Sequence, residues 1–141
     1  MTRIKITFPE KTLYQYKSTI GVSMINYGGH LGNDSVLTIF HDARIAFFHK
    51  HGLTELNISD DSGVIQNDAA VQYISEGKLH DEITTSIAIE VTSSRGFDIY
   101  YKIESKNGSK PIAIGKTGMI MFNYGTKKMS QVPDSFRDLI K

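Results

Sequence analysis

The residues best suited to chemistry lie together in one glycine-rich stretch near the start of the chain. Residues 26–34 read NYGGHLGND, which combines three glycines with a histidine, two amides and a carboxylate. Glycines allow a backbone to approach a ligand closely, and the free N–H groups at the start of a helix attract negative charge. Such a helix start can stabilise an oxyanion that forms on an acyl carbonyl. The alternative interpretation is a tight turn that caps a helix, with His30 held by a hydrogen bond.

Three other patterns that could be enzyme sites do not match the geometry that their chemistry needs. Gly115-Lys116-Thr117 lacks the earlier glycine of a phosphate-binding loop, because Lys110 occupies that position. His49 and His51 are two residues apart, so on a helix they point to different sides and cannot bind one metal ion together. The chain has no cysteine and no G-x-S-x-G motif. We therefore expect no bound metal, and water as the nucleophile of any hydrolysis.

The length and charge of the chain exclude several classes of protein. Its 141 residues fit a single domain that spans residues 1–141. Apolar residues make up 40% and charged residues 22%, which is typical of a globular protein. A formal net charge of +1 disfavours a nucleic-acid partner or a membrane surface, since both attract a basic excess. With no secretory signal and no apolar run of about 20 residues, we expect a cytoplasmic protein that does not span a membrane.

Most of the chain alternates between apolar and polar residues, as β-strands with one buried face do. The clearest example is residues 83–92, where isoleucines alternate with threonine, serine and glutamate. Five strands are predicted, over residues 14–24, 65–73, 83–92, 97–104 and 112–122. The polar connections at residues 93–96 and 106–109 are typical of hairpin loops. We therefore expect the last four strands to form an antiparallel meander.

One segment has the apolar spacing of a helix instead. Over residues 33–51 the apolar side chains recur at intervals of three and four, in a stripe wide enough to predict a deeply buried helix. The polar residues 33–35 supply possible N-cap oxygens, and Gly52 is a suitable residue just past the end of the helix. A short closing helix is expected over residues 133–140.

The predicted order of elements is a strand, a long helix and four strands, which together define an α+β protein. A single antiparallel sheet of about five strands that wraps around the long helix is the simplest packing, because the helix needs apolar surface around it. This arrangement leaves two sheet edges exposed. Unpaired edges associate readily with another strand, so we expect dimers formed by edge pairing.

The glycine-rich stretch and the helix after it resemble the opening of hot-dog-fold acyl-CoA thioesterases of the 4-hydroxybenzoyl-CoA thioesterase type. Those proteins often carry D-x-x-G-H-x-N-N, followed by an aromatic-rich helix that ends in E-x-A-R. In this chain the corresponding residues are Gly29-His30, Asn33 and Ala43-Arg44. The similarity continues through Val71-Gln72-Tyr73 and covers residues 14–136.

The resemblance implies the hot-dog fold and an acyl-CoA thioesterase that acts as a homodimer or a dimer of dimers. Coenzyme A then enters as part of the acyl-CoA substrate, and no other cofactor is implied. The implied site residues are Asn26, His30, Asn33 and Asp34 for catalysis, and Gly28, Gly29 and Tyr73 for substrate binding. The backbone N–H groups near Gly28, Gly29 and His30 are expected to polarise the thioester carbonyl.

Two motif positions depart from the family pattern, and both bear on which group accepts a proton. Asn26 replaces the aspartate that often acts as base or nucleophile, and His41 replaces the glutamate of E-x-A-R. An amide can orient water but cannot accept its proton at neutral pH. His30, Asp34, His41 or a residue of a partner chain is left for that role. Arg44 has two interpretations, a contact to phosphate or pantetheine and an ion pair that ties the helix to the sheet.

Two other functions are compatible with the same residues. A hot-dog protein could bind an acyl-CoA or an acyl carrier protein without hydrolysing the thioester, and the amide of Asn26 favours that alternative. A related dehydratase would pair a histidine with a carboxylate, for which His30 and Asp34 are available.

Overall fold

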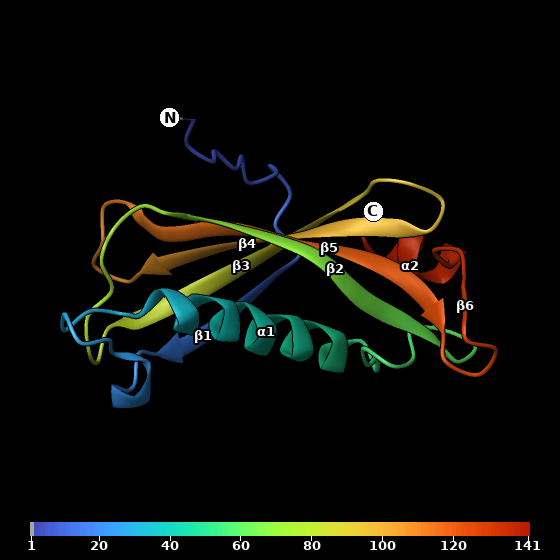
Figure 1. Cartoon of the computed structure of the whole chain (residues 1–141), viewed down its shortest axis with the longest axis horizontal. Helices are drawn as coiled ribbons and strands as arrows, with labels where there is room; N and C mark the ends of the chain where they lie inside the picture. The colour runs from blue at the N-terminus through green and yellow to red at the C-terminus, as the bar shows by residue number, and fades with distance from the viewer. Residues whose placement is uncertain (1) are drawn as a thin grey trace.

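The computed structural model describes residues 2–141, and one antiparallel sheet and one long helix make up most of it (Figure 1). The strands are β1 (Tyr14–Thr19), β2 (Ser62–Tyr73), β3 (Glu82–Val91), β4 (Gly96–Ser105), β5 (Pro111–Asn123) and β6 (Lys128–Met129). The helices are the 3-10 turn η1 (Val22–Met24), the long α1 (Asn33–Lys50) and the short α2 (Asp134–Leu139). The α+β class predicted from the sequence is confirmed.

The five long strands lie in the order β1-β3-β4-β5-β2, and every neighbouring pair is antiparallel. Strands β3, β4 and β5 form the predicted meander. The prediction that β2 belongs to the same meander is wrong, because β2 pairs with β5, with Tyr73 opposite Ala113. The connection from β2 to β3 covers residues 74–81, which is longer than a tight hairpin and instead crosses the end of the sheet.

This crossing segment, residues 74–81, is bonded to the turn that precedes α1. The N–H of Leu31 donates to Gly77 O at 2.8 Å, and the N–H of His80 donates to Ile20 O at 2.9 Å. Gly77 is buried, and a Cβ at this position would press against the side chains of Ile20 and Leu31. The crossing segment therefore lies directly against the start of α1.

The first predicted strand is shorter than the sequence pattern suggests. β1 ends at Thr19, and the last part of the predicted segment 14–24 forms η1 instead. Beyond η1, Ile25 and Leu31 pair as an isolated antiparallel bridge that closes the glycine-rich turn. The turn thus leads directly from the end of β1 into α1.

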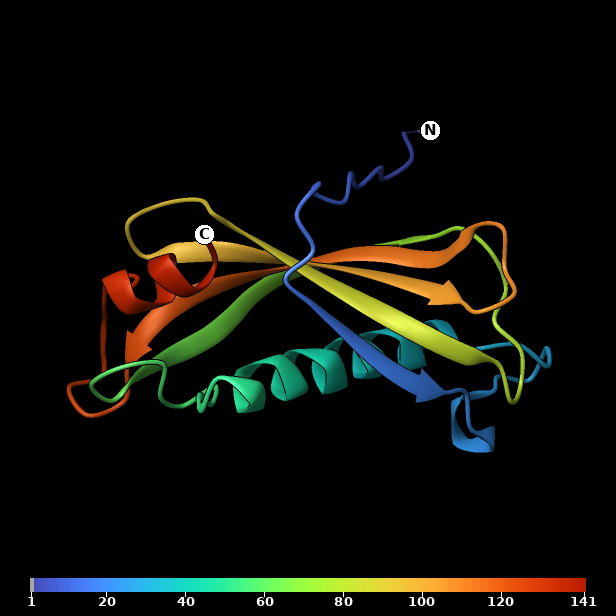
Figure 2. The same cartoon turned by 180° about the vertical axis from the view of Figure 1, so that it is seen from behind.

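Helix α1 packs one face against the sheet and leaves the other face open (Figures 1 and 2). Its buried residues are Val36, Ile39, Phe40, Ala43, Arg44, Phe47 and Phe48. The prediction of a deeply buried helix is confirmed for this face only, since Leu37 and Ile45 each keep 42% of their surface exposed. The apolar stripe is therefore wider than one sheet can cover.

Backbone geometry, rather than polar side chains, defines both ends of α1. The N-cap is Gly32, which has no side-chain hydrogen bond, so the predicted capping by residues 33–35 is wrong because these residues already lie in the first turn. At the other end Gly52 adopts a φ of +70°. Its N–H and that of Leu53 donate to last-turn carbonyls at 3.0 and 2.8 Å. This Schellman arrangement confirms Gly52 as the residue that ends the helix.

Aromatic rings fill the space between α1 and the sheet. Phe40 stacks on Tyr101 with ring centroids 4.4 Å apart, and both side chains are fully buried. A Cβ on Gly115 would overlap the ring of Phe40, so the glycine makes this stack possible. Near the far end of the sheet, Phe97 packs on Phe136 of α2 at 4.7 Å. This contact closes the core there and confirms the predicted closing helix.

The N-terminal residues 2–13 pass over the sheet on the face opposite α1 (Figure 2). The N–H of Ile6 donates to the side-chain oxygen of Gln72 on β2 at 3.0 Å. The ammonium of Lys102 on β4 lies 4.8 Å from the ring centroid of Phe8. These contacts hold the segment against the central strand β4 and the edge strand β2.

Candidate active site

A pocket of about 290 Å³ opens where the glycine-rich turn, the first turn of α1, the end of β2 and the crossing segment meet. Four residues predicted for the site line it, namely Asn26, His30, Asn33 and Tyr73. Glu76 and a neighbouring serine of the crossing segment complete the polar lining, and apolar side chains of the glycine-rich turn, α1, the crossing segment and β5 form the rest. The predicted site residues Gly28, Gly29 and Asp34 lie beside the pocket along the chain but do not line it.

Asn26 organises the glycine-rich turn with its side-chain oxygen. Its Oδ1 accepts the N–H groups of Gly28 at 3.0 Å and His30 at 3.2 Å, while its backbone oxygen accepts the N–H of Gly29 at 3.0 Å. Gly29 has a φ of +86°, a conformation that favours glycine. The three N–H groups expected to polarise a carbonyl therefore already have acceptors inside the turn. The Nδ2 group of Asn26 points away from these donors and can itself donate a hydrogen bond.

The first turn of α1 presents N–H groups that remain unused. The N–H groups of Asn33 and Asp34 have no acceptor among residues 2–141, and the next one, on Ser35, donates to Gly32 O at 3.1 Å. Tyr73 O–H donates to Asn33 O at 3.3 Å and so ties the end of β2 to this turn. Free N–H groups and the helix dipole together make the helix start attractive to negative charge.

The structure adds Glu76 to the site, a residue that sequence reasoning missed. Its Oε2 lies 3.0 Å from Nε2 of His30, and the two side chains are 66% and 40% exposed. In the sequence, Glu76 is one of several charged residues in a polar connection, so no pattern distinguishes it. Only the path of the crossing segment against the helix start brings it to His30. Glu76 could have been assigned to the site only if the pairing of β2 with β5 had been predicted.

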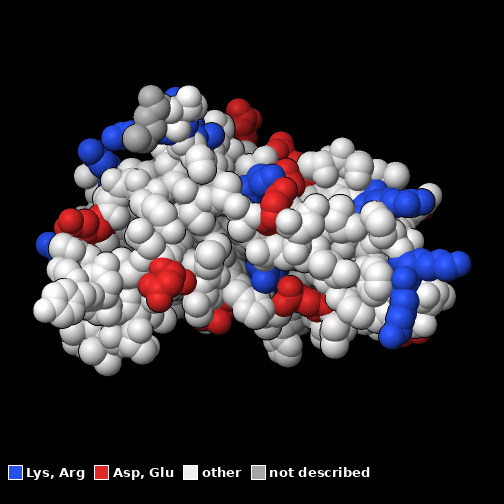
Figure 3. All heavy atoms as spheres, in the orientation of Figure 1, with Lys and Arg blue, Asp and Glu red and all other residues white. Residues whose placement is uncertain are grey.

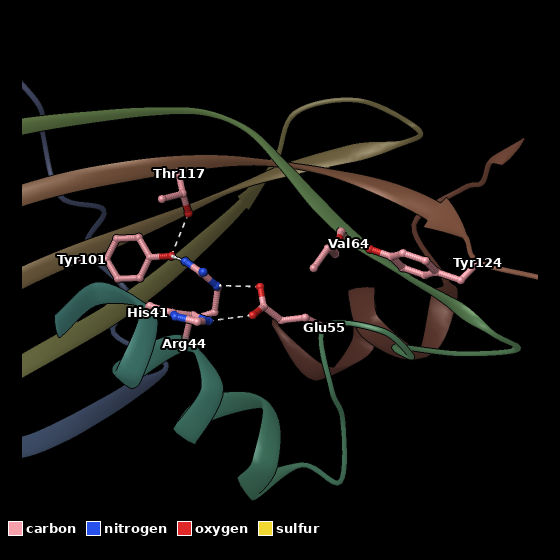
Figure 4. A network of polar contacts seen from close by, with 7 residues as sticks. All are labelled: His41, Arg44, Glu55, Val64, Tyr101, Thr117 and Tyr124. Carbon is pink, nitrogen blue, oxygen red and sulfur yellow. Dashed lines mark hydrogen bonds and ion pairs between the residues drawn. The ribbon is translucent and has the colours of Figure 1, made fainter. Parts of the chain in front are cut away.

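His41 and Arg44 lie outside the pocket, in a polar network between α1 and the sheet (Figure 4). Arg44 Nε donates to Glu55 Oε2 at 3.1 Å, and its Nη1 donates to the hydroxyl of Tyr101 at 2.9 Å. His41 Nε2 lies 2.9 Å from Glu55 Oε1. The ion-pair interpretation of Arg44 is thus confirmed, with Glu55 as the partner.

The same network extends into the sheet through Tyr101. Burial raises the pKa of the Tyr101 hydroxyl, although the nearby Arg44 guanidinium opposes this shift, so the phenol keeps its proton at neutral pH. Because Arg44 donates to the phenol oxygen, that proton is available for Thr117 Oγ1 at 2.7 Å. The hydrogen bonds therefore join α1 to β4 and β5 through the core.

The Gly115-Lys116-Thr117 triplet is part of strand β5 and serves the sheet. Lys116 Nζ lies 3.4 Å from Asp68 Oδ1 and 3.6 Å from Asp98 Oδ1, on neighbouring strands. Burial raises the pKa of Asp98, although Lys116 opposes the shift. With the glycine against Phe40 and the threonine bonded to Tyr101, all three residues have structural contacts. Their strand setting agrees with the prediction that they are not a phosphate-binding loop.

Charged side chains of both signs are interspersed over the face shown in Figure 3, and most of that face is neither acidic nor basic. Across residues 2–141, no three His, Asp or Glu side chains lie together in a way that could hold a metal ion. Within the same part of the chain, no helix is long and apolar enough to cross a membrane.

An antiparallel sheet curved around one long helix, with a pocket at the helix start, is the architecture of hot-dog proteins. Residues 20–140 match the sequence profile of the thioesterase-like superfamily. The chain belongs to this superfamily. Among curated proteins, none matches the chain.

Solved structures share this fold over nearly the whole chain. A 1,4-dihydroxy-2-naphthoyl-CoA thioesterase from Synechocystis is 16% identical with a TM-score of 0.80, over 90% of this chain and 94% of its own. A Staphylococcus aureus protein in complex with CoA is 18% identical with a TM-score of 0.78, over 96% of this chain and 85% of its own. A gentisyl-coenzyme A thioesterase is 16% identical with a TM-score of 0.77, over 91% of this chain and 100% of its own. These matches confirm the predicted hot-dog fold.

Proposed function

We propose that this protein is an acyl-CoA thioesterase, which hydrolyses an acyl-CoA thioester to a free acid and CoA. The observation that carries the proposal is the open start of α1, where the N–H groups of Asn33 and Asp34 lack acceptors in the described chain beside a pocket that contains His30. Such N–H groups stabilise the oxyanion that forms when a thioester carbonyl is attacked. Membership of the thioesterase-like superfamily makes thioester hydrolysis the reaction that fits this geometry.

In this mechanism the thioester carbonyl accepts hydrogen bonds from the N–H groups of Asn33 and Asp34. Water attacks the carbonyl carbon from the side of the pocket that Asn26 and His30 line. The Nδ2 group of Asn26 donates to a ligand oxygen, since Oδ1 is held by the turn. At about 290 Å³ the pocket lies at the small end of ligand sites, so it accommodates the acyl end while the nucleotide of CoA stays at the surface.

We also propose that two copies associate through the outer edge of β2. Among the described strands β2 is bonded to β5 alone. Near its start the N–H of Val64 donates to Glu55 O at 2.7 Å and the hydroxyl of Tyr124 donates to Val64 O at 2.9 Å, so the part of its outer edge beyond Val64 is left without a neighbouring strand. Nearby apolar side chains are exposed, including Leu37 and Ile45 on the open face of α1 and Tyr73 on β2. Antiparallel pairing of two β2 edges would satisfy the free backbone groups and cover these side chains. A dimer of dimers would add a second contact surface.

The second candidate function is a protein that binds an acyl-CoA or acyl carrier protein without hydrolysis. The observation that favours it is Asn26, whose amide oxygen is fully used by two backbone N–H groups. An amide at this position supplies no proton acceptor. The two functions therefore differ in turnover and not in ligand class.

The deciding experiment is steady-state release of free thiol from short, long, benzoyl and phenylacetyl acyl-CoAs. We expect turnover on one substrate class, a loss of about 100-fold or more in His30→Ala, and no change in His49→Ala. His49 is an exposed histidine in the last turn of α1, far along the helix from the pocket, and so serves as a matched control. Absence of thiol release, together with tight acyl-CoA binding by calorimetry, would favour the binding protein.

A further inference from the structure

Glu76 combines two properties that no other acidic residue of the described chain shares. It lines the pocket, and its carboxylate touches the imidazole of His30, with Oε2 and Nε2 3.0 Å apart. The two residues come from different elements, the glycine-rich turn and the crossing segment. The hydrogen bond between Leu31 N–H and Gly77 O fixes the two elements at the neighbouring positions. The contact is therefore built by the fold and not by two adjacent surface residues.

The other proton acceptors expected from the sequence lie elsewhere or are unsuitable. Asp34 does not line the pocket. His41 lies outside the pocket, where its side chain contacts Glu55. Asn26 is an amide and cannot take a proton from water. His30 is the basic side chain that lines the pocket, and Glu76 is the residue that holds its ring.

We propose that His30 is the general base of thioester hydrolysis and that Glu76 is its positioning residue. This inference rests on the proposed thioesterase function. With Nε2–H donated to the carboxylate of Glu76, the ring presents Nδ1 as the acceptor. The same contact fixes the orientation of the ring.

Water forms a bond to the carbonyl carbon, the carbonyl π pair moves onto oxygen, and the water proton passes to Nδ1 of His30. The oxyanion pair then re-forms the carbonyl, the carbon–sulfur bond breaks, and the same proton passes from His30 to the departing sulfur. The products are the free acid and the CoA thiol, and the imidazole returns to its neutral form.

Charged and titratable groups from several elements surround the pair. Tyr73 faces it from the end of β2. Lys78 and Asp81 of the crossing segment, and Lys110 before β5, line an adjoining groove that Glu76 also borders. The N–H of Lys78 donates to Asp81 Oδ2 at 2.9 Å. In the described chain, the ion pair of Glu76 is with His30 and with neither lysine.

The test compares Glu76→Gln, Glu76→Asp and Glu82→Gln with the wild-type enzyme on the best acyl-CoA substrate. Glu82 is a close control, because its side chain is 65% exposed and also forms an ion pair, with Lys106 at 3.1 Å. We measure kcat and KM for each protein. A His30→Ala variant and the His30→Ala/Glu76→Gln double variant complete the set.

We expect Glu76→Gln to lower kcat by about 10-fold to 100-fold with KM changed less than about twofold. The ratio kcat/KM should fall by about the same factor as kcat, because the ring loses the group that fixes its tautomer while the substrate contacts remain. Glu76→Asp should recover part of kcat, and Glu82→Gln should match wild type. The double variant should be no slower than His30→Ala, since Glu76 acts through the imidazole.

An active enzyme whose kcat is unchanged by Glu76→Gln would overturn the role of Glu76 and leave the thioesterase proposal intact. A double variant much slower than His30→Ala would also overturn it, because Glu76 would then act independently. A wild-type protein that releases no thiol from any acyl-CoA would overturn both proposals together.

Discussion

Asn26 holds the glycine-rich turn together through its side-chain amide oxygen. We predict that Asn26→Ala lowers kcat/KM by about 10-fold to 100-fold, because Gly28 and His30 lose the acceptor that fixes their N–H groups. Asn26→Asp keeps an acceptor oxygen and should keep KM near the wild-type value. Both constants are measured by thiol release. Unchanged kinetics in Asn26→Ala would show that the side chain has no part in catalysis.

Arg44 carries a guanidinium whose side chain is only 8% exposed, and Glu55 supplies its counter-charge. We predict that Glu55→Gln lowers the free energy of unfolding by about 1–3 kcal/mol, since a buried charge would lose its ionic partner while Glu55 itself is partly exposed. Urea unfolding at pH 7 measures this loss.

The control for this prediction is His41→Gln, which alters the exposed partner of the same glutamate. We expect it to change the free energy of unfolding by less than about 0.5 kcal/mol. Equal losses in the two variants would contradict the assignment of the stabilising charge pair to Arg44.

The residues of the site illustrate how far the sequence alone leads. Asn26, His30 and Asn33 could be placed together because they are neighbours along the chain. Glu76 could not, because its approach to His30 depends on the path of a connection between distant strands. The resemblance matched His41 to a glutamate of the family motif, whereas the structure places it against Glu55, in a loop whose position the sequence pattern does not specify.

At the scale of elements, the packing of α1 against β5 depends on the absence of a side chain at Gly115. We predict that Gly115→Ala destabilises the protein by about 1–3 kcal/mol, because the added Cβ would overlap the fully buried ring of Phe40. Thermal unfolding measures the effect. A smaller side chain at position 40, as in the double variant Gly115→Ala/Phe40→Leu, should restore part of the lost stability.

Gly21→Ala is the matched control for this element. A Cβ at Gly21 would meet nothing within 4 Å, and the residue has a φ of −94°, which alanine adopts readily. We expect a change within about 0.5 kcal/mol. A similar loss at both glycines would mean that the Phe40 contact is not the cause.

Element types followed from apolar periodicity, whereas their neighbours in the sheet did not. Residues 83–92 alternate so regularly that β3 could be predicted almost to its ends. The same alternation in β2 carries no information about which strand lies beside it. In the structure β2 pairs with β5 and forms the edge of the sheet opposite β1. Periodicity also overestimated the burial of α1, because it reports apolar surface and not what covers that surface.

At the scale of the whole molecule, the uncovered apolar face of α1 and the free edge of β2 predict a homodimer. We predict that Ile45→Lys shifts the molar mass from dimer toward monomer in light scattering after size exclusion, because a charge would be buried between the two copies. Met129→Lys is the control, since Met129 is 52% exposed on β6, on the other side of β5 from β2. A dimer that persists in Ile45→Lys would place the contact on another surface.

The strand pairings of the sheet join distant parts of the chain, such as Tyr14 with Ile87 and Tyr73 with Ala113. Contacts of this kind form slowly during folding, because the intervening chain loses its freedom before the contacts stabilise it. Helix α1, in contrast, is made of local hydrogen bonds and can form early. The pocket is complete only when both edge strands and the crossing segment are in place. On refolding from denaturant, recovery of enzyme activity should therefore lag behind recovery of helical circular dichroism.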